Sequence, residues 1–166
     1  MSEPLPVSRT DAAALLARLR ERGWRVGVAE SLTGGAVLSS LVSVPGASSV
    51  LRGGIVAYAT DLKTSLLGVD ADLLAREGPV HPEVALQMAH GIRRATAERD
   101  MPTDVGVATT GVAGPESQGG APVGRVFVAV VTPEGERVDR LDLVGDRAAV
   151  RAGAHEAVLA LLAVSL

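Results

Sequence analysis

The sequence predicts a single α/β domain in which helices flank a mixed, mostly parallel sheet. Segments with the periodicity of amphipathic helices alternate with short apolar segments typical of strands. A hairpin pattern near the end of the chain adds antiparallel pairing. Hydrophobic residues make up 47% and charged residues 21% of the 166 residues, which is the balance of a globular protein. We therefore expect one domain over residues 1–166, with an N-terminal helix within residues 1–24 and the functional motifs within residues 25–166.

The first half of the chain is predicted to begin with an amphipathic helix. Its leucines form one apolar stripe, Ser8 or Thr10 can cap its start, and Gly23 is typical of a helix end. Short apolar segments before Ser31 and Tyr58 predict two strands. The expected elements are a helix over 10–22, a strand over 25–29, a turn over 30–35 that opens a helix to about 43, a strand over 54–59 and a helix over 62–67.

The second half is predicted to contain a central strand and a late hairpin. Pro82 is typical of the first turn of a helix, and the apolar segment before Gly111 favours a strand inside the sheet. Residues 111–122 hold four Gly and two Pro and are expected to be a loop. The expected elements are helices over 70–77 and from 82 to about 99, a strand over 104–110, paired strands over 123–132 and 136–143, and a helix over 148–162.

The composition argues against several classes of function. A net charge of −3 and an aromatic content of 2% disfavour single-stranded nucleic acid as a partner. The chain has no cysteine, which excludes disulfides, thiolate nucleophiles and cysteine-bound zinc. His81, His90 and His155 lie on separate segments without metal-site spacing, so we expect no metal. We see no secretory signal and no uninterrupted apolar run of about 18 residues, and expect a cytoplasmic protein without a membrane partner.

Lys63 is the only lysine among 16 basic side chains. Arginine keeps its charge at any practical pH, whereas a desolvated lysine can lose its proton and act as a base. Lys63 can therefore mark a position where arginine would not perform the required chemistry. The alternative is a solvated lysine on a helix surface.

Ser31 lies where a predicted buried strand gives way to a helix. Such junctions expose a side chain at the carboxyl edge of an α/β sheet, where ligands bind. Thr33, Gly34 and Gly35 follow, and their backbone N–H groups at a helix start can hold an oxyanion or a phosphate. The alternative is that Ser31 or Thr33 only caps the helix.

Tyr58 and Lys63 lie five residues apart, across a strand end and a helix start. A serine hydroxyl becomes a good nucleophile when a nearby base takes its proton, and an un-ionised lysine can be that base. Tyr58, the only tyrosine, can relay a proton or orient a substrate. The alternative is a tyrosine packed at a strand end beside a solvated lysine.

Two further segments are suited to contact a ligand. The small residues of 109–115 let the backbone approach a ligand closely, although an ordinary wide turn has the same composition. Arg147, at the start of the last predicted helix, can pair with a phosphate. Alternatively, Asp146 caps that helix and Arg147 bridges to an acid.

Taken together, the motifs of this sequence resemble the CinA C-terminal domain family. They run in family order from about Arg25 to the end of the sequence. The matching segments are AESLTGG (29–35), VPGASS (44–49), GGIVAY (53–58), KTSLLGV (63–69), TGVAGP (110–115), PVG (122–124) and GDR (145–147).

The resemblance implies a stand-alone nicotinamide mononucleotide deamidase. Such an enzyme hydrolyses the carboxamide to nicotinic acid mononucleotide and ammonia through a Ser–Lys acyl-enzyme. The resemblance also implies an α/β fold, a homodimer and no cofactor. Two other functions stay open: a non-catalytic nucleotide-binding module, and an amidase for another small carboxamide.

The family's functional residues can be carried over by position. Ser31 matches the nucleophile, Lys63 its base and Tyr58 the tyrosine beside them. The residues that match substrate-binding positions are Ser48, Thr110, Gly111 and Arg147, besides the segment Thr33, Gly34 and Gly35. Three departures stand out: Leu32 replaces a frequent cysteine, Thr109 replaces an apolar residue, and the loop over 116–121 is shorter and lacks a lysine before Pro122.

Overall fold

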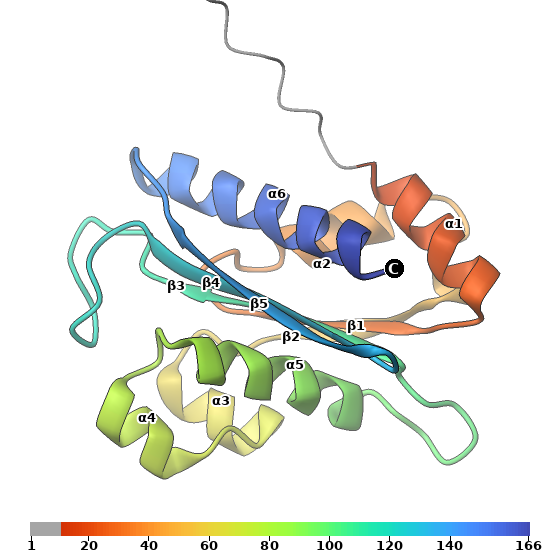
Figure 1. Cartoon of the computed structure of the whole chain (residues 1–166), viewed down its shortest axis with the longest axis horizontal. Helices are drawn as coiled ribbons and strands as arrows, with labels where there is room; N and C mark the ends of the chain where they lie inside the picture. The colour runs from red at the N-terminus through yellow and green to blue at the C-terminus, as the bar shows by residue number, and fades with distance from the viewer. Residues whose placement is uncertain (1–10) are drawn as a thin grey trace, which may run out of the picture.

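The fold is a five-stranded mixed sheet with helices on both faces (Figure 1). The structure is a computed structural model that describes residues 11–166. The strands lie in the order β2-β1-β3-β4-β5, and β4 alone runs against the other four. Their bounds are β1 Val26–Glu30, β2 Leu51–Val56, β3 Val105–Gly111, β4 Arg125–Thr132 and β5 Gly135–Asp142. The predicted mixed, mostly parallel sheet is confirmed.

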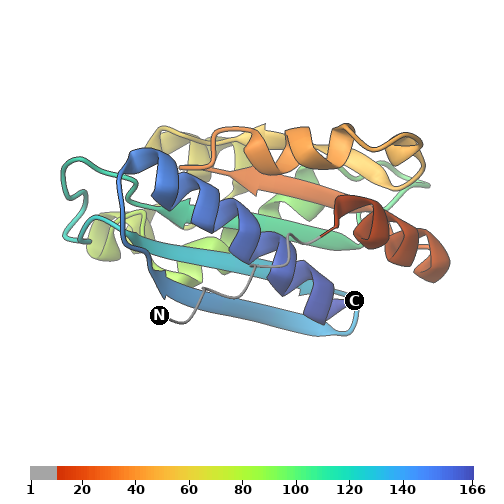
Figure 2. The same cartoon turned by 90° about the horizontal axis from the view of Figure 1, so that it is seen from above.

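Helices α1, α2 and α6 cover one face of the sheet, and α3, α4 and α5 cover the other (Figures 1 and 2). The last helix crosses the sheet above β3 and β4, and α5 lies against the same two strands from the opposite side. The helix bounds are α1 Ala12–Arg22, α2 Ala36–Val42, α3 Thr60–Leu67, α4 Ala71–Glu77, α5 Pro82–Ala95 and α6 Arg147–Ser165, with a short 3-10 turn at Ala47–Ser49.

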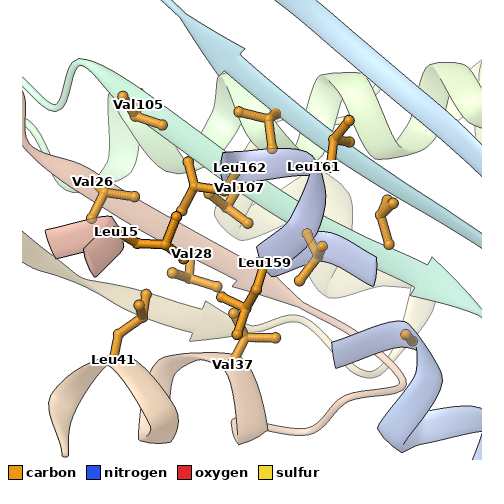
Figure 3. Packing of buried hydrophobic residues seen from close by; sticks show 14 of the residues in the cluster. Leu15, Val26, Val28, Val37, Leu41, Val105, Val107, Leu159, Leu161 and Leu162 are labelled. Carbon is orange, nitrogen blue, oxygen red and sulfur yellow. The ribbon is translucent and has the colours of Figure 1, made fainter. Parts of the chain in front are cut away.

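The alternation of side chains along the central strands builds the two cores. Val26 and Val28 of β1 point toward α1, α2 and α6, whereas Ala29 points to the other face. Figure 3 shows these valines packed with Leu41 of α2 and Leu159 of α6. Because both faces are covered, the central strands are apolar at nearly every position, as the sequence predicted for β3.

Several element boundaries differ from the prediction, among them those of β2, α5 and α1. Strand β2 begins at Leu51, and its first residues pair with β1 across a register shift. An arginine and two glycines in this segment hide the strand pattern in the sequence. Helix α5 ends at Ala95, where the Thr96 hydroxyl donates to the Ile92 carbonyl and the chain turns toward β3. Helix α1 is capped by Asp11, whose side chain accepts the Ala13 N–H; the predicted caps Ser8 and Thr10 lie outside the described residues.

Helix α6 is the one helix within residues 11–166 that is long and apolar enough to cross a membrane. Its apolar side chains, however, lie in the core beneath it. Val150, Ala154, Val158 and Leu162 are all buried against the sheet. These contacts pack one face of α6 into the core of the domain.

Close packing of α5 on β3 depends on Gly106. A Cβ at this position would lie 1.9 Å from the Ala89 carbonyl oxygen, which is a backbone atom and cannot rotate away. We expect Gly106→Ala to destabilise the fold by about 3 kcal/mol, the upper end of typical overpacking costs. The control is Gly153→Ala in α6, whose Cβ meets only the flexible Leu143 side chain at 3.0 Å. Chemical denaturation should show the control to be neutral or stabilising, and equal losses for both variants would contradict the packing argument.

Candidate active site

A cavity of about 120 Å³ opens at the carboxyl edge of the sheet. Strands β1 and β3 end there in parallel, and α3 and α6 begin there (Figure 1). Of the predicted site residues, those that line the cavity are Ser31, Tyr58, Lys63, Thr110, Gly111 and Arg147. The structure therefore brings both halves of the predicted dyad and the predicted phosphate ligand into one site.

Ser31 and Lys63 are in direct contact. The Nζ of Lys63 lies 3.1 Å from the Oγ of Ser31 and donates a second hydrogen bond, of 2.7 Å, to the Ala57 carbonyl oxygen. Lys63 is 1% exposed and Ser31 is 7% exposed. The alternative of a solvated lysine on a helix surface is wrong, because α3 turns this side chain inward beneath the end of β2.

Because it is buried, Lys63 loses its proton more easily than an exposed lysine does. Loss of hydration lowers the pKa of its ammonium group from 10.5 to about 8. Within residues 11–166 no carboxylate forms an ion pair with it that would hold the charge. At pH 7 roughly a tenth of the Lys63 side chains are therefore un-ionised and able to accept a proton.

The loop that carries Ser31 is held by a carboxylate that the sequence analysis did not single out. Glu30 is 1% exposed, and its side chain accepts the backbone N–H groups of Gly35, Val37 and Leu38 at 2.8 to 3.2 Å. These are the N–H groups at the start of α2, so Glu30 caps the helix from the strand that precedes it. The sequence did offer a signal for this role, since Glu30 ends a predicted buried strand directly before Ser31.

The prediction that the N–H groups of Gly34 and Gly35 are open to a ligand is wrong. The Gly35 N–H donates to Glu30, and the Gly34 N–H donates to the Ser31 carbonyl oxygen at 3.1 Å. Neither glycine lines the cavity. Both have a positive φ, of 61° and 97°, so they allow the tight turn between β1 and α2 rather than contact a ligand.

Thr33 also supports the loop from below and does not reach the cavity. It is fully buried, and its hydroxyl is 2.9 Å from the Thr109 hydroxyl of β3. The Thr109 hydroxyl in turn accepts the Ser31 N–H at 3.4 Å. The threonine that departs from the family pattern is thus a partner of the serine loop.

Arg151 of α6 holds the same loop from the face of the sheet that α2 and α6 cover. Its guanidinium donates to the carbonyl oxygens of Leu32 at 2.9 Å and Thr33 at 3.1 Å. Arg151 was noted only as lying one turn after Arg147. Nothing in the sequence signals that it reaches a loop 119 residues away.

Arg147 and Tyr58 meet at the mouth of the cavity. The guanidinium donates to the Tyr58 hydroxyl at 3.1 Å and to the Gly114 carbonyl oxygen at 2.7 Å. Tyr58 is 59% exposed, so the alternative of a tyrosine packed at a strand end is wrong. The alternative for Arg147 was that Asp146 caps α6 and Arg147 bridges to an acid. Asp146 does cap α6, but Arg147 makes no ion pair within residues 11–166.

On β3, the Thr110 hydroxyl donates to the Pro79 carbonyl oxygen.

Ser48 does not reach this cavity. It lies in the 3-10 turn before β2, next to a separate surface depression. Because β1 and β2 are parallel, the start of β2 and the end of β1 lie at opposite edges of the sheet. A strand of five residues separates them by roughly 15 Å. Within one chain, Ser48 is therefore not a neighbour of Ser31.

Glu30→Gln should destabilise the protein by about 1–3 kcal/mol. The amide has one acceptor oxygen and no charge, so it leaves buried N–H groups of α2 without a partner. Thermal unfolding should fall by roughly 2–4 °C for each kcal/mol in a chain of this size. Glu21→Gln on the exposed face of α1 is the matched control and should change stability by less than about 0.5 kcal/mol. Equal melting temperatures for the two variants would show that Glu30 does not hold the loop.

Comparison with known proteins gives consistent matches. The family model of the CinA C-terminal domain matches residues 9–166. A CinA-like protein of Frankia casuarinae is 44% identical over 137 residues, which cover 82% of this chain and 30% of that protein. A CinA-like protein of Anaeromyxobacter dehalogenans is 45% identical over 155 residues, covering 92% of this chain and 36% of that protein. The chain spans about a third of the length of the curated relatives it matches.

Solved structures match along nearly the whole chain. A CinA superfamily protein from Escherichia coli superposes with a TM-score of 0.89 at 29% identity, covering 99% of this chain and 95% of that chain. A competence/damage inducible protein from Agrobacterium tumefaciens gives a TM-score of 0.85 at 30% identity, with 98% of each chain covered. Since the family model and the solved folds both match along the chain, the chain belongs to the CinA C-terminal domain family.

Proposed function

We propose that this chain is an amidohydrolase that converts nicotinamide mononucleotide and water to nicotinic acid mononucleotide and ammonia. The observation that supports this proposal best is the 3.1 Å contact between the buried Lys63 Nζ and the Ser31 Oγ at the floor of a cavity. A serine beside a lysine of lowered pKa is suited to acyl transfer. The substrate, a homodimer and a cytoplasmic location are inferred from the family resemblance.

In the acylation step Lys63 acts as a general base. Its un-ionised Nζ takes the proton of the Ser31 hydroxyl while Oγ attacks the carboxamide carbon. The tetrahedral intermediate collapses as the carbon–nitrogen bond breaks, and the departing nitrogen takes the proton from Lys63 to leave as ammonia. Water then attacks the resulting ester with Lys63 again as base, which releases the carboxylate and restores the Ser31 hydroxyl.

The negative charge of the tetrahedral intermediate requires hydrogen-bond donors beside Ser31. Residues 11–166 provide no acceptor for the backbone N–H groups of Leu32 and Thr33, and Leu32 lines the cavity. The Leu32 N–H shares its peptide group with the Ser31 carbonyl oxygen, which accepts the Gly34 N–H at 3.1 Å. Arg151 donates to the carbonyl oxygens of Leu32 and Thr33 and so holds the peptide groups that follow. We propose the N–H group of Leu32 as an oxyanion donor, in place of those of Gly34 and Gly35.

Arg147 is proposed to bind the phosphate of the mononucleotide. Its guanidinium has five N–H donors, and the Tyr58 hydroxyl and the Gly114 carbonyl oxygen use two of them. The remaining donors have the fork geometry that phosphate oxygens accept. Tyr58 would orient the guanidinium at the cavity mouth, which places it beside the substrate and away from direct proton transfer with Lys63.

The proposal is tested by comparing three carboxamides. Ammonia release is measured from nicotinamide mononucleotide, nicotinamide riboside and free nicotinamide under identical conditions. We expect kcat/KM for the mononucleotide to exceed that for the riboside by about 10²-fold or more, the contribution of a charge-assisted contact of about 3 kcal/mol. Equal turnover of all three would contradict phosphate binding. Tight binding of the mononucleotide without ammonia release would instead favour a non-catalytic nucleotide-binding module.

A further inference from the structure

The cavity contains two opposite charges that do not neutralise each other. Glu116 and Arg147 both line it, and both side chains belong to exposed residues. Among the ion pairs of residues 11–166, neither has an oppositely charged partner within 4.0 Å. Lys63 at the floor is the third charged group in the lining, and it faces Ser31. A carboxylate and a guanidinium thus line one cavity without forming an ion pair with each other.

A hydrogen bond connects Arg147 to the chain segment that leads to Glu116. Gly114, two residues before Glu116, accepts a hydrogen bond from the Arg147 guanidinium at 2.7 Å. The loop over 116–121 is therefore tied to the start of α6, yet the Glu116 carboxylate does not fold back onto Arg147. The arrangement leaves both charges available to a ligand that brings its own opposite charges.

We propose that Glu116 and Arg147 select a zwitterionic ligand, with Glu116 facing a cationic ring and Arg147 an anionic group. This inference rests on the proposed function and deepens it. Nicotinamide mononucleotide carries a fixed positive charge on the pyridinium ring that bears the carboxamide, and a negative charge on its phosphate. Glu116 lies in the loop over 116–121, which the family resemblance marks as a departure from the usual pattern.

The size of the effect follows from the exposure of Glu116. Ion pairs of exposed carboxylates contribute little, and a fixed ring cation within a cavity lies at the upper end of that range. We expect the contact to change the dissociation constant about 3- to 10-fold. Such a change is large enough to measure and small enough to leave the fold intact.

The test compares two ligands that differ in ring charge. Nicotinamide mononucleotide and its reduced form share the carboxamide, ribose and phosphate, but the dihydropyridine ring of the reduced form is neutral. Both are titrated calorimetrically into the Ser31→Ala chain, with and without Glu116→Gln. We expect Glu116→Gln to weaken binding of the pyridinium form about 3- to 10-fold and to change binding of the reduced form less than about 2-fold.

Two control variants complete the design. Glu98→Gln removes the same charge from the loop before β3, at the opposite edge of the sheet, and should change neither dissociation constant. Arg147→Gln should weaken both ligands to the same degree, because both carry the phosphate. If Glu116→Gln weakens both ligands equally, or neither, or if neither ligand binds, the inference is overturned.

Ammonia release by the unaltered chain decides the proposed function separately. A chain that binds the pyridinium form through Glu116 but releases no ammonia would contradict amide hydrolysis while supporting charge selection. A chain that releases ammonia with no dependence of binding on Glu116 would support hydrolysis and overturn charge selection.

Discussion

Replacing Ser31 by alanine is expected to reduce ammonia release from nicotinamide mononucleotide by at least about 10³-fold. The substitution removes the only hydroxyl in contact with the Lys63 Nζ among the described residues, so no acyl-enzyme can form. The backbone of the loop is held by Glu30, Thr109 and Arg151, none of which depends on the Ser31 side chain. Binding of the mononucleotide should therefore persist, and kcat rather than KM should carry the loss.

Ser65→Ala is the matched control for this experiment. Ser65 lies on the exposed side of α3, two residues from Lys63, and does not line the cavity. It should retain full activity and the same melting temperature. Residual turnover of Ser31→Ala within 10-fold of the unaltered chain would sink the nucleophile assignment. Loss of activity together with loss of folding would leave the control to show whether the site or the scaffold was damaged.

Lys63→Arg is expected to abolish turnover to a similar degree. Arginine keeps its proton at any practical pH and cannot take one from Ser31. The larger guanidinium must also fit a site that is 1% exposed, so circular dichroism and melting should accompany the assay. Lys63→Met removes the base without adding a charge and should give the same loss of activity. Near-normal activity of either variant would exclude Lys63 as the base.

The pH dependence of the unaltered chain gives an independent check on Lys63. Because the un-ionised form is the active one, kcat/KM should rise with pH and level off above an apparent pKa of about 8. A profile that falls through this range would require the ammonium form instead.

The stability of the chain should also depend on Lys63. Between pH 8 and 10.5 the unfolded chain binds the proton that the folded chain has released, so the free energy of unfolding rises with pH.

The expected gain in the free energy of unfolding is about 3 kcal/mol over this range, or about 1.4 kcal/mol per pH unit. Below pH 8 the full cost of burying a protonated Lys63 is present. Lys63→Met has no group to titrate there and should lack this rise. Parallel stability curves for the two proteins between pH 8 and 10.5 would contradict the lowered pKa.

The dyad was predictable because two kinds of signal converged on it. Ser31 follows an apolar strand and precedes glycines, and Lys63 is the only lysine in a chain that otherwise uses arginine. Both signals are local in the sequence, and parallel strands bring the ends of such segments to one edge of the sheet. The layers and the late hairpin were predictable for the same reason, since periodicity and turn residues report on nearby residues.

The supports of the site were not predictable in this way. Arg151 acts through a long side chain whose direction depends on packing between elements far apart in the sequence. Ser48 shows the converse case, because its motif resembles the family pattern while the parallel pairing of β1 and β2 puts it at the other edge of the sheet. A pattern gives residue types and order, whereas reach across a sheet depends on three-dimensional distances.

The grip of Arg151 on the Ser31 loop has a consequence for the timing of biosynthesis. A ribosome releases the sheet strands and both dyad residues before α6, and domains fold as their chain emerges. Until α6 docks, the carbonyl oxygens of Leu32 and Thr33 lack their guanidinium partner and the neighbouring N–H groups have no fixed direction. A nascent chain therefore lacks both the core packing of α6 and this support of the Ser31 loop until translation has delivered residues 147–165.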